Sequence, residues 1–229
     1  MTTTTRRWLL AASLILATGL GTGCNVLELP FFLMGPEPKK EASLKRIASD
    51  DKQKEVKLVL VAYSGLETRP EFIQADRQLT ELLAKHLREL FEYNKERVTV
   101  VSPRKVEEYK SNRPNWHQEL DPAQIGRHFR ADYVAFLDIN DLGLFEKGSI
   151  NKLYRGQADI TVTLVDVNVK DDYPERKEFT HTFPGAAKGP IPVDDMSLIQ
   201  FRQLFLAAVA RRLAWYFTSH PTARDFEMD

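Results

Sequence analysis

The sequence predicts an α/β fold with a mixed sheet, arranged as a single three-layer-like domain. Two observations carry this prediction. Residues 56–63 form a nearly continuous apolar run, typical of a strand covered on both faces, and apolar residues then recur at helical spacing to about Tyr93. Residues 157–167 alternate between apolar and polar, which is typical of a strand with one covered face. We therefore expect early β-α-β crossovers, a late antiparallel hairpin and a C-terminal helix.

The remaining elements follow in order along the chain. We expect strands at 97–101, 132–139 and 176–183, and helices at 103–109, 122–129 and 194–218. Asp121 before Pro122 is a helix start, because the carboxylate accepts the free backbone N–H groups and proline at the first position needs no acceptor. Asp194 or Asp195 is expected to cap the last helix. The polar stretch between Ile139 and Gln157 is expected to be a connection.

The N-terminus predicts export from the cytoplasm. Arg6 and Arg7 precede an apolar stretch to Leu20 and three small residues, and Cys24 follows as the only cysteine of the chain. The apolar stretch is shorter than the roughly 20 residues that a membrane-spanning helix needs. Residues 1–23 are therefore predicted to be a signal peptide. The adjacent arginines also fit a twin-arginine export signal.

The residues Leu20-Gly21-Thr22-Gly23-Cys24 resemble the lipobox of bacterial lipoproteins, although Gly21 stands where a branched aliphatic residue is usual. The resemblance implies that Cys24 receives lipid and becomes the first residue of the mature chain. Two or more acyl chains give stable membrane anchoring. An ordinary signal peptide followed by a chance cysteine is the alternative. Asn25 is not the aspartate associated with inner-membrane retention, so an outer-membrane location facing the periplasm is favoured.

The boundaries follow from these segments. We expect a lipidated flexible linker at 24–54, an α/β domain at 55–219 and a tail at 220–229. Within the linker, the apolar residues 31–34 either enter the bilayer interface or pack on the domain. The chain has 32 basic and 32 acidic residues, and loss of Arg6 and Arg7 leaves the mature chain slightly acidic. This balance argues against a nucleic-acid partner.

Two further stretches carry a family resemblance. Phe129-Arg130-Ala131-Asp132-Tyr133-Val134, and the alternating strand that ends in Leu164-Val165-Asp166-Val167, resemble the signature of envelope proteins built on the TolB amino-terminal domain fold. The curli-secretion lipoprotein has a similar architecture. The resemblance covers about residues 56–218, and it implies a non-enzymatic envelope role and often oligomerisation.

The residues themselves predict no catalytic, metal-binding or cofactor-binding site. The five histidines are scattered without metal-ligand spacing, and no nucleophile or phosphate-loop motif occurs. The strand-end aspartates are Asp132, Asp138, Asp141, Asp159 and Asp166. They could converge as an acid/base pair, but residues at such positions usually accept backbone amides.

Aromatic residues are the candidate interface. Trp116, between Pro114 and His117, is the candidate for an exposed aromatic contact, with ordinary burial as the alternative. The last helix is apolar almost all round, with Trp215 and Phe217 near its end. Such a helix is buried on more than one side, either within the domain or against another protein. We therefore expect a membrane-anchored module that binds or assembles another envelope component or itself. A hydrolase of cell-wall or surface polymer and a purely structural spacer are the alternatives.

Overall fold

The computed structural model describes residues 38–44, 47–49, 54–65, 70–113, 115–119, 121–169 and 174–222. The chain divides into two compact units, and every described residue belongs to the second, Pro38–Asp229. The predicted signal peptide, Cys24 and the apolar residues 31–34 lie outside the described residues. Within the described residues, no helix is both long enough and apolar enough to cross a membrane.

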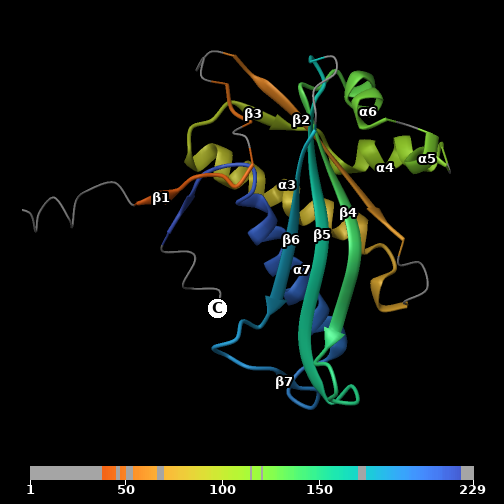
Figure 1. Ribbon diagram of the computed structural model, residues 1–229, viewed down its shortest axis with the longest axis vertical. Helices are drawn as coiled ribbons and strands as arrows, with labels where there is room; N and C mark the ends of the chain where they lie inside the picture. The colour runs from red at the N-terminus through yellow and green to blue at the C-terminus, as the bar shows by residue number, and fades with distance from the viewer. Residues whose placement is uncertain are drawn as a thin grey trace, which may run out of the picture. The chain divides into compact units, whose positions relative to one another are not determined.

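The centre of the domain is a mixed sheet (Figure 1). Its strands are β2 (Val56–Ser64), β3 (Val98–Val100), β4 (Tyr133–Phe145), β5 (Leu153–Asp166) and β6 (Glu175–Phe183), in the spatial order β3-β2-β4-β5-β6. β2 runs parallel to β3 and to β4, whereas β5 is antiparallel to both of its neighbours, β4 and β6. A short strand, β7 (Ile191–Pro192), pairs with the start of β5. The predicted mixed sheet and late hairpin are confirmed.

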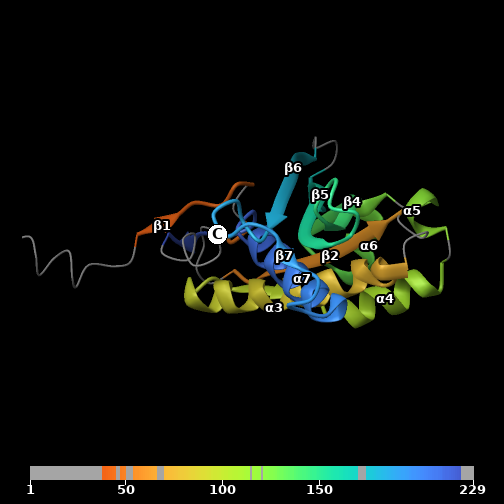
Figure 2. The same ribbon diagram turned by 90° about the horizontal axis from the view of Figure 1, so that it is seen from below.

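Helices cover both faces of the sheet. The 3-10 helix η1 (Pro70–Phe72), α3 (Ala75–Tyr93) and α7 (Leu198–Ala214) lie on what we call the inner face, and α4 (Pro103–Ser111), α5 (Trp116–Glu119) and α6 (Pro122–Phe129) lie on the outer face (Figure 2). Even-numbered β2 residues such as Leu58 and Leu60 face α3 and α7, and Val59 and Val61 face the smaller helices. This explains the continuous apolar run in β2, because both faces of the strand are buried.

One of the two predicted helix caps is confirmed and the other is wrong. The carboxylate of Asp121 accepts a hydrogen bond from the Ala123 amide, as predicted for the start of α6. The predicted cap of the last helix was wrong, since the cap is Ser197 rather than Asp194 or Asp195. Ser197 and Gln200 form a reciprocal capping box that satisfies two backbone N–H groups.

The predicted connection between Ile139 and Gln157 was also wrong, because strands β4 and β5 extend through most of it. Only residues 146–152 remain as the loop of this long hairpin. The pairing register shifts between Ile139 and Asp141, which leaves both Asn140 and Asp141 exposed. That bulge interrupts the alternation by which a strand is recognised in sequence.

The folded unit begins before the predicted boundary at residue 55. Strand β1 (Lys39–Lys40) pairs with β8 (His220–Pro221), so part of the predicted linker and part of the predicted tail form a two-stranded sheet. The Leu44 amide donates to the Tyr216 carbonyl, at 2.9 Å. Leu44 and Ile47 are buried in the main core. A flexible linker is therefore not observed over the described part of residues 38–49.

Candidate binding face

The outer face of the sheet has a covered half and an open half. Over β2 and the start of β4, the three smaller helices bury a compact apolar cluster of Val59, Val61, Val101, Val106, Trp116, Ile125, Ala131 and Val134. Further along β4, β5 and β6, the outward side chains of the described residues are mostly polar and reach solvent. We call this second half the open face.

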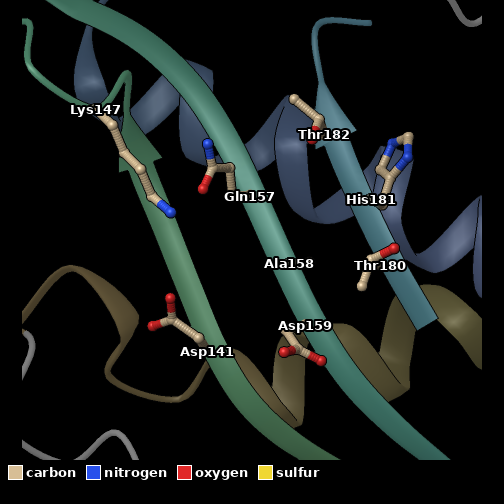
Figure 3. Close-up of a pocket in the computed structure, with 8 residues that line it drawn as sticks. All are labelled: Asp141, Lys147, Gln157, Ala158, Asp159, Thr180, His181 and Thr182. Atoms are coloured by element: carbon tan, nitrogen blue, oxygen red, sulfur yellow. The ribbon is translucent and has the colours of Figure 1, made fainter. Parts of the chain in front are cut away.

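A hollow of about 290 Å³ lies on the open face (Figure 3). Its lining residues come from β4, β5, β6 and the hairpin loop, and they are Asp141, Lys147, Gln157, Ala158, Asp159, Thr180, His181 and Thr182. Strand register places them side by side, because Asp159 lies opposite Asp141 on β4 and opposite Thr180 on β6. Gln157 lies opposite Thr182 in the same way.

Carboxylates dominate the charge of the hollow. Asp141 on β4 and Asp159 on β5 lie directly opposite each other, so their negative charges repel. Asn140 moderates this repulsion, since its side-chain amide donates to a carboxylate oxygen of Asp159 at 3.2 Å and to the Thr161 hydroxyl at 3.0 Å. Lys147 brings a positive charge from the hairpin loop. The floor offers hydroxyl, amide and carboxylate groups to a polar ligand.

A second polar cluster lies where β2 ends, around the buried ammonium of Lys110. This group donates to the Ala62 carbonyl at 3.0 Å, to Asp76 at 3.3 Å and to Glu107 at 2.7 Å. Its three donors therefore each have an acceptor. The ammonium also lies 5.0 Å from the Trp116 ring centroid. The cluster joins β2, α3 and α4, and we assign it a structural role.

The predicted exposed contact at Trp116 was wrong. Its side chain is only 7% exposed and packs edge-on against Tyr63, with ring centroids 6.0 Å apart. α5, which the sequence did not predict, carries it onto the outer face of β2. Trp116 is therefore part of the smaller core, and its side chain is not available to a partner protein.

The predicted interface at Trp215 and Phe217 was wrong for the same reason. Trp215 is 5% exposed and Phe217 is fully buried. The Trp215 ring stacks on His220 at 4.1 Å, and the Arg212 guanidinium lies 4.4 Å from the same ring. The apolar surplus at the end of α7 is covered by the N-terminal segment and by β8, so its partner lies within the domain.

The described histidines act mainly in packing. His117 stacks on Tyr63 with ring centroids 4.4 Å apart, and His128 packs on Tyr109 at 4.3 Å. Burial lowers the pKa of His86, although a hydrogen bond and the charge of Glu89 oppose that shift. The described residues contain no group of three or more His, Cys, Asp or Glu side chains that could hold a metal ion.

Sequence reasoning named Asp141 and Asp159 only as members of a set of strand-end aspartates, and it missed Gln157, Thr180 and Thr182 as neighbours. The structure brings these residues together. Asp132 lies instead at the opposite end of β4, where its carboxylate accepts a hydrogen bond from the Lys57 backbone amide at 2.8 Å. The available signal was the polar face of the alternating strand at 157–167, but the register of its neighbours is not readable from the sequence.

Comparison with known proteins gives low similarities. No family model matches the chain, and no curated protein matches it. Among solved structures, the PelC dodecamer from Paraburkholderia phytofirmans is 13% identical, with 80% of this chain and 99% of that chain covered and a TM-score of 0.41. Lipoprotein GNA1162 from Neisseria meningitidis is 15% identical, with coverages of 70% and 99% and a TM-score of 0.37.

Protein XCC0632 from Xanthomonas campestris is 11% identical, with 76% of this chain and 91% of that chain covered and a TM-score of 0.43. Bacterial lipoproteins are thus among the solved structures that the chain matches. Similarities of this size assign no role to the chain, so any function has to be argued from its own residues.

Proposed function

We propose that the chain is a lipid-anchored protein of the bacterial cell envelope, whose domain is a non-enzymatic binding module for another envelope component or for a second copy. The observation that carries this proposal is the open face. Helices cover the rest of the sheet in the described residues, whereas β4, β5 and β6 present a hollow of carboxylate, amide and hydroxyl groups. A concave surface with convergent polar groups is a typical binding site.

The anchor is supported by the sequence around Cys24, which resembles a lipobox. The fourteen residues from Cys24 to Glu37 precede the folded unit, and fully extended they reach at most about 50 Å. A tether of that length lets the domain work within the periplasm while it stays attached. Asn25 favours the outer membrane as the site of attachment.

Lipid attachment is tested by metabolic labelling with a clickable fatty acid. The wild-type protein should carry the label and sediment with membranes, because only the Cys24 thiol can form the thioether. Cys24→Ser should lose the label and accumulate as precursor or soluble protein. Equal labelling of the variant and the wild type would refute the anchor.

Hydrolysis of a cell-wall or surface polymer is the second candidate function. One observation favours it, since Asp141 and Asp159 lie directly opposite each other at the hollow and paired carboxylates catalyse glycoside hydrolysis. Incubation with purified wall polymer distinguishes the two functions. Release of soluble fragments by the wild type, and its loss in Asp159→Asn, would establish the hydrolase in place of the binding module.

A further inference from the structure

Strand β6 forms an edge of the main sheet. It pairs with β5 on one side, and no strand of the described residues pairs with its other side (Figures 1 and 2). Part of this edge is covered, because the Tyr216 hydroxyl donates to the Glu178 carbonyl at 3.2 Å. Burial raises the pKa of the Tyr216 hydroxyl. An edge strand with free backbone groups is a template for pairing with another chain.

The Tyr216 hydrogen bond shows which backbone groups of β6 point outward. Because the Glu178 carbonyl accepts from Tyr216, we infer that it is directed away from β5, and backbone groups in a strand change direction at each residue. The N–H and carbonyl groups of Thr180 and Thr182 therefore also point to the open edge. Both side chains are exposed and line the hollow of the open face. The edge and the hollow are thus continuous.

Charge determines which kind of strand fits this edge. On the outer side of β6, Glu178 lies two residues before Thr180. Asp159 lies opposite Thr180 on β5, and Asp141 lies opposite Asp159 on β4. Arg176 and Lys147 mark the two ends of this acidic stretch. A basic side chain on the outward side of an added strand would lie beside Glu178 and could extend across β6 towards Asp159, whereas Asp141 lies one strand further away. The intervening side chains would lie on the side of Phe179, His181 and Phe183, which is mainly aromatic.

We propose that β6 accepts an extended segment of a partner protein by strand addition at Thr180–Thr182, and that this segment carries basic residues at alternate positions. In strand addition, backbone hydrogen bonds provide affinity and alternate side chains provide specificity. This inference rests on the proposed binding function and names the chemistry of its partner. A second copy of β6 is less suitable, because its two acidic and two basic residues bring no excess of positive charge to the carboxylates of this face.

The test uses a nine-residue peptide of alternating lysine and valine, with glutamate in place of lysine as the control peptide. Binding to the full domain is measured by fluorescence anisotropy, at two salt concentrations. The lysine peptide should bind and should weaken as salt rises, because screening reduces the attraction of its charges to Asp159 and Asp141. The glutamate peptide should not bind.

Two variants at one position isolate the backbone contribution. Thr180→Pro removes an outward N–H and leaves the β5–β6 hydrogen bonds in place, because an edge strand tolerates proline at a position that does not donate to its neighbour. The variant should weaken binding by about tenfold or more. Thr180→Val keeps the N–H and removes only the hydroxyl, so its loss of binding should be at least about threefold smaller than that of Thr180→Pro. Circular dichroism melts establish that both variants fold. Asp159→Asn should weaken binding by about threefold, as expected for one exposed charge pair.

Several outcomes would overturn the inference. If Thr180→Pro is folded and binds the peptide as tightly as Thr180→Val does, the peptide does not add to the edge of β6. If Asp159→Asn still weakens peptide binding in that case, the peptide binds to the open face instead. Preference for the glutamate peptide, or no binding of either peptide, would refute the proposed partner chemistry. A dimer of the protein alone that Thr180→Pro disrupts would show that a second copy occupies the edge. Fatty-acid labelling of Cys24 is independent of all these results.

Discussion

At the residue scale, several contacts join residues far apart in the chain, such as the hydrogen bonds from the Leu44 amide to the Tyr216 carbonyl and from Lys110 to the Ala62 carbonyl. α7 is apolar on most sides, so its pattern could not distinguish a partner outside the domain from the segment that covers Trp215 within it. Residues 38–44 and Ile47 provide that cover, and their sequence shows no period that would predict a core contact. Lys110 is a similar case, since its burial depends on acceptors far away in sequence.

Replacement of Trp215 by alanine tests its internal role. The ring is nearly buried and stacks between Arg212 and His220, so Trp215→Ala should lower the free energy of unfolding by about 3–5 kcal/mol. Equilibrium denaturation in urea measures this change. Trp215→Phe, which keeps an aromatic ring, should cost less. A loss below about 1 kcal/mol in the alanine variant would mean that the ring contributes little to the core.

Two glycines in the long hairpin give a matched pair of substitutions. A Cβ on Gly156 would collide with the Phe205 ring of α7, whereas a Cβ on Gly143 meets no atom within 4 Å. Gly156→Ala should therefore destabilise the domain by about 1–3 kcal/mol, because the core has no room for it. Gly143→Ala should change stability by about 0.5 kcal/mol or less. Thermal melts of the two variants decide this, and equal melting temperatures would contradict the close packing of β5 on α7.

At the element scale, the elements with an uninterrupted period were predicted well and the others were not. β2, α6 and β6 appear close to their expected positions, because continuous burial, a capped start and simple alternation each give a local signal. The extension of β4 and β5 was missed, since the bulge at Asn140 and the glycines at 143 and 156 disturb the alternation. β1 and β8 are two residues long and depend entirely on each other.

Ile47 tests whether the N-terminal segment belongs to the folded unit. Its side chain is 1% exposed in the main core, so Ile47→Ala should reduce the free energy of unfolding by about 2–4 kcal/mol. Ile199 is a matched control, because its side chain is 70% exposed and Ile199→Ala should cost about 0.5 kcal/mol or less. Chemical denaturation of the two variants is the measurement. If the two variants have equal free energies of unfolding, residues 38–49 belong to the predicted linker and not to the folded unit.

At the scale of the whole molecule, the sequence predicted the layered mixed sheet but could not predict the candidate site. Strand order follows from short crossovers and the late hairpin, which are local rules. The hollow depends on two registers at once, β4 with β5 and β5 with β6, and on the uneven cover that α4, α5 and α6 give the outer face. Asp141, Gln157 and Thr182 become neighbours only when those registers are fixed.

We propose that the domain is held at the membrane through Cys24 and presents its open face to a partner. Site-specific photo-cross-linking in the native envelope tests it most directly, with the reactive residue at Gln157 on the open face or at Lys85 on the exposed side of α3. The account predicts a covalent adduct from Gln157, its marked reduction when Cys24 is serine, and no adduct from Lys85. An adduct from Lys85 and none from Gln157 would contradict it.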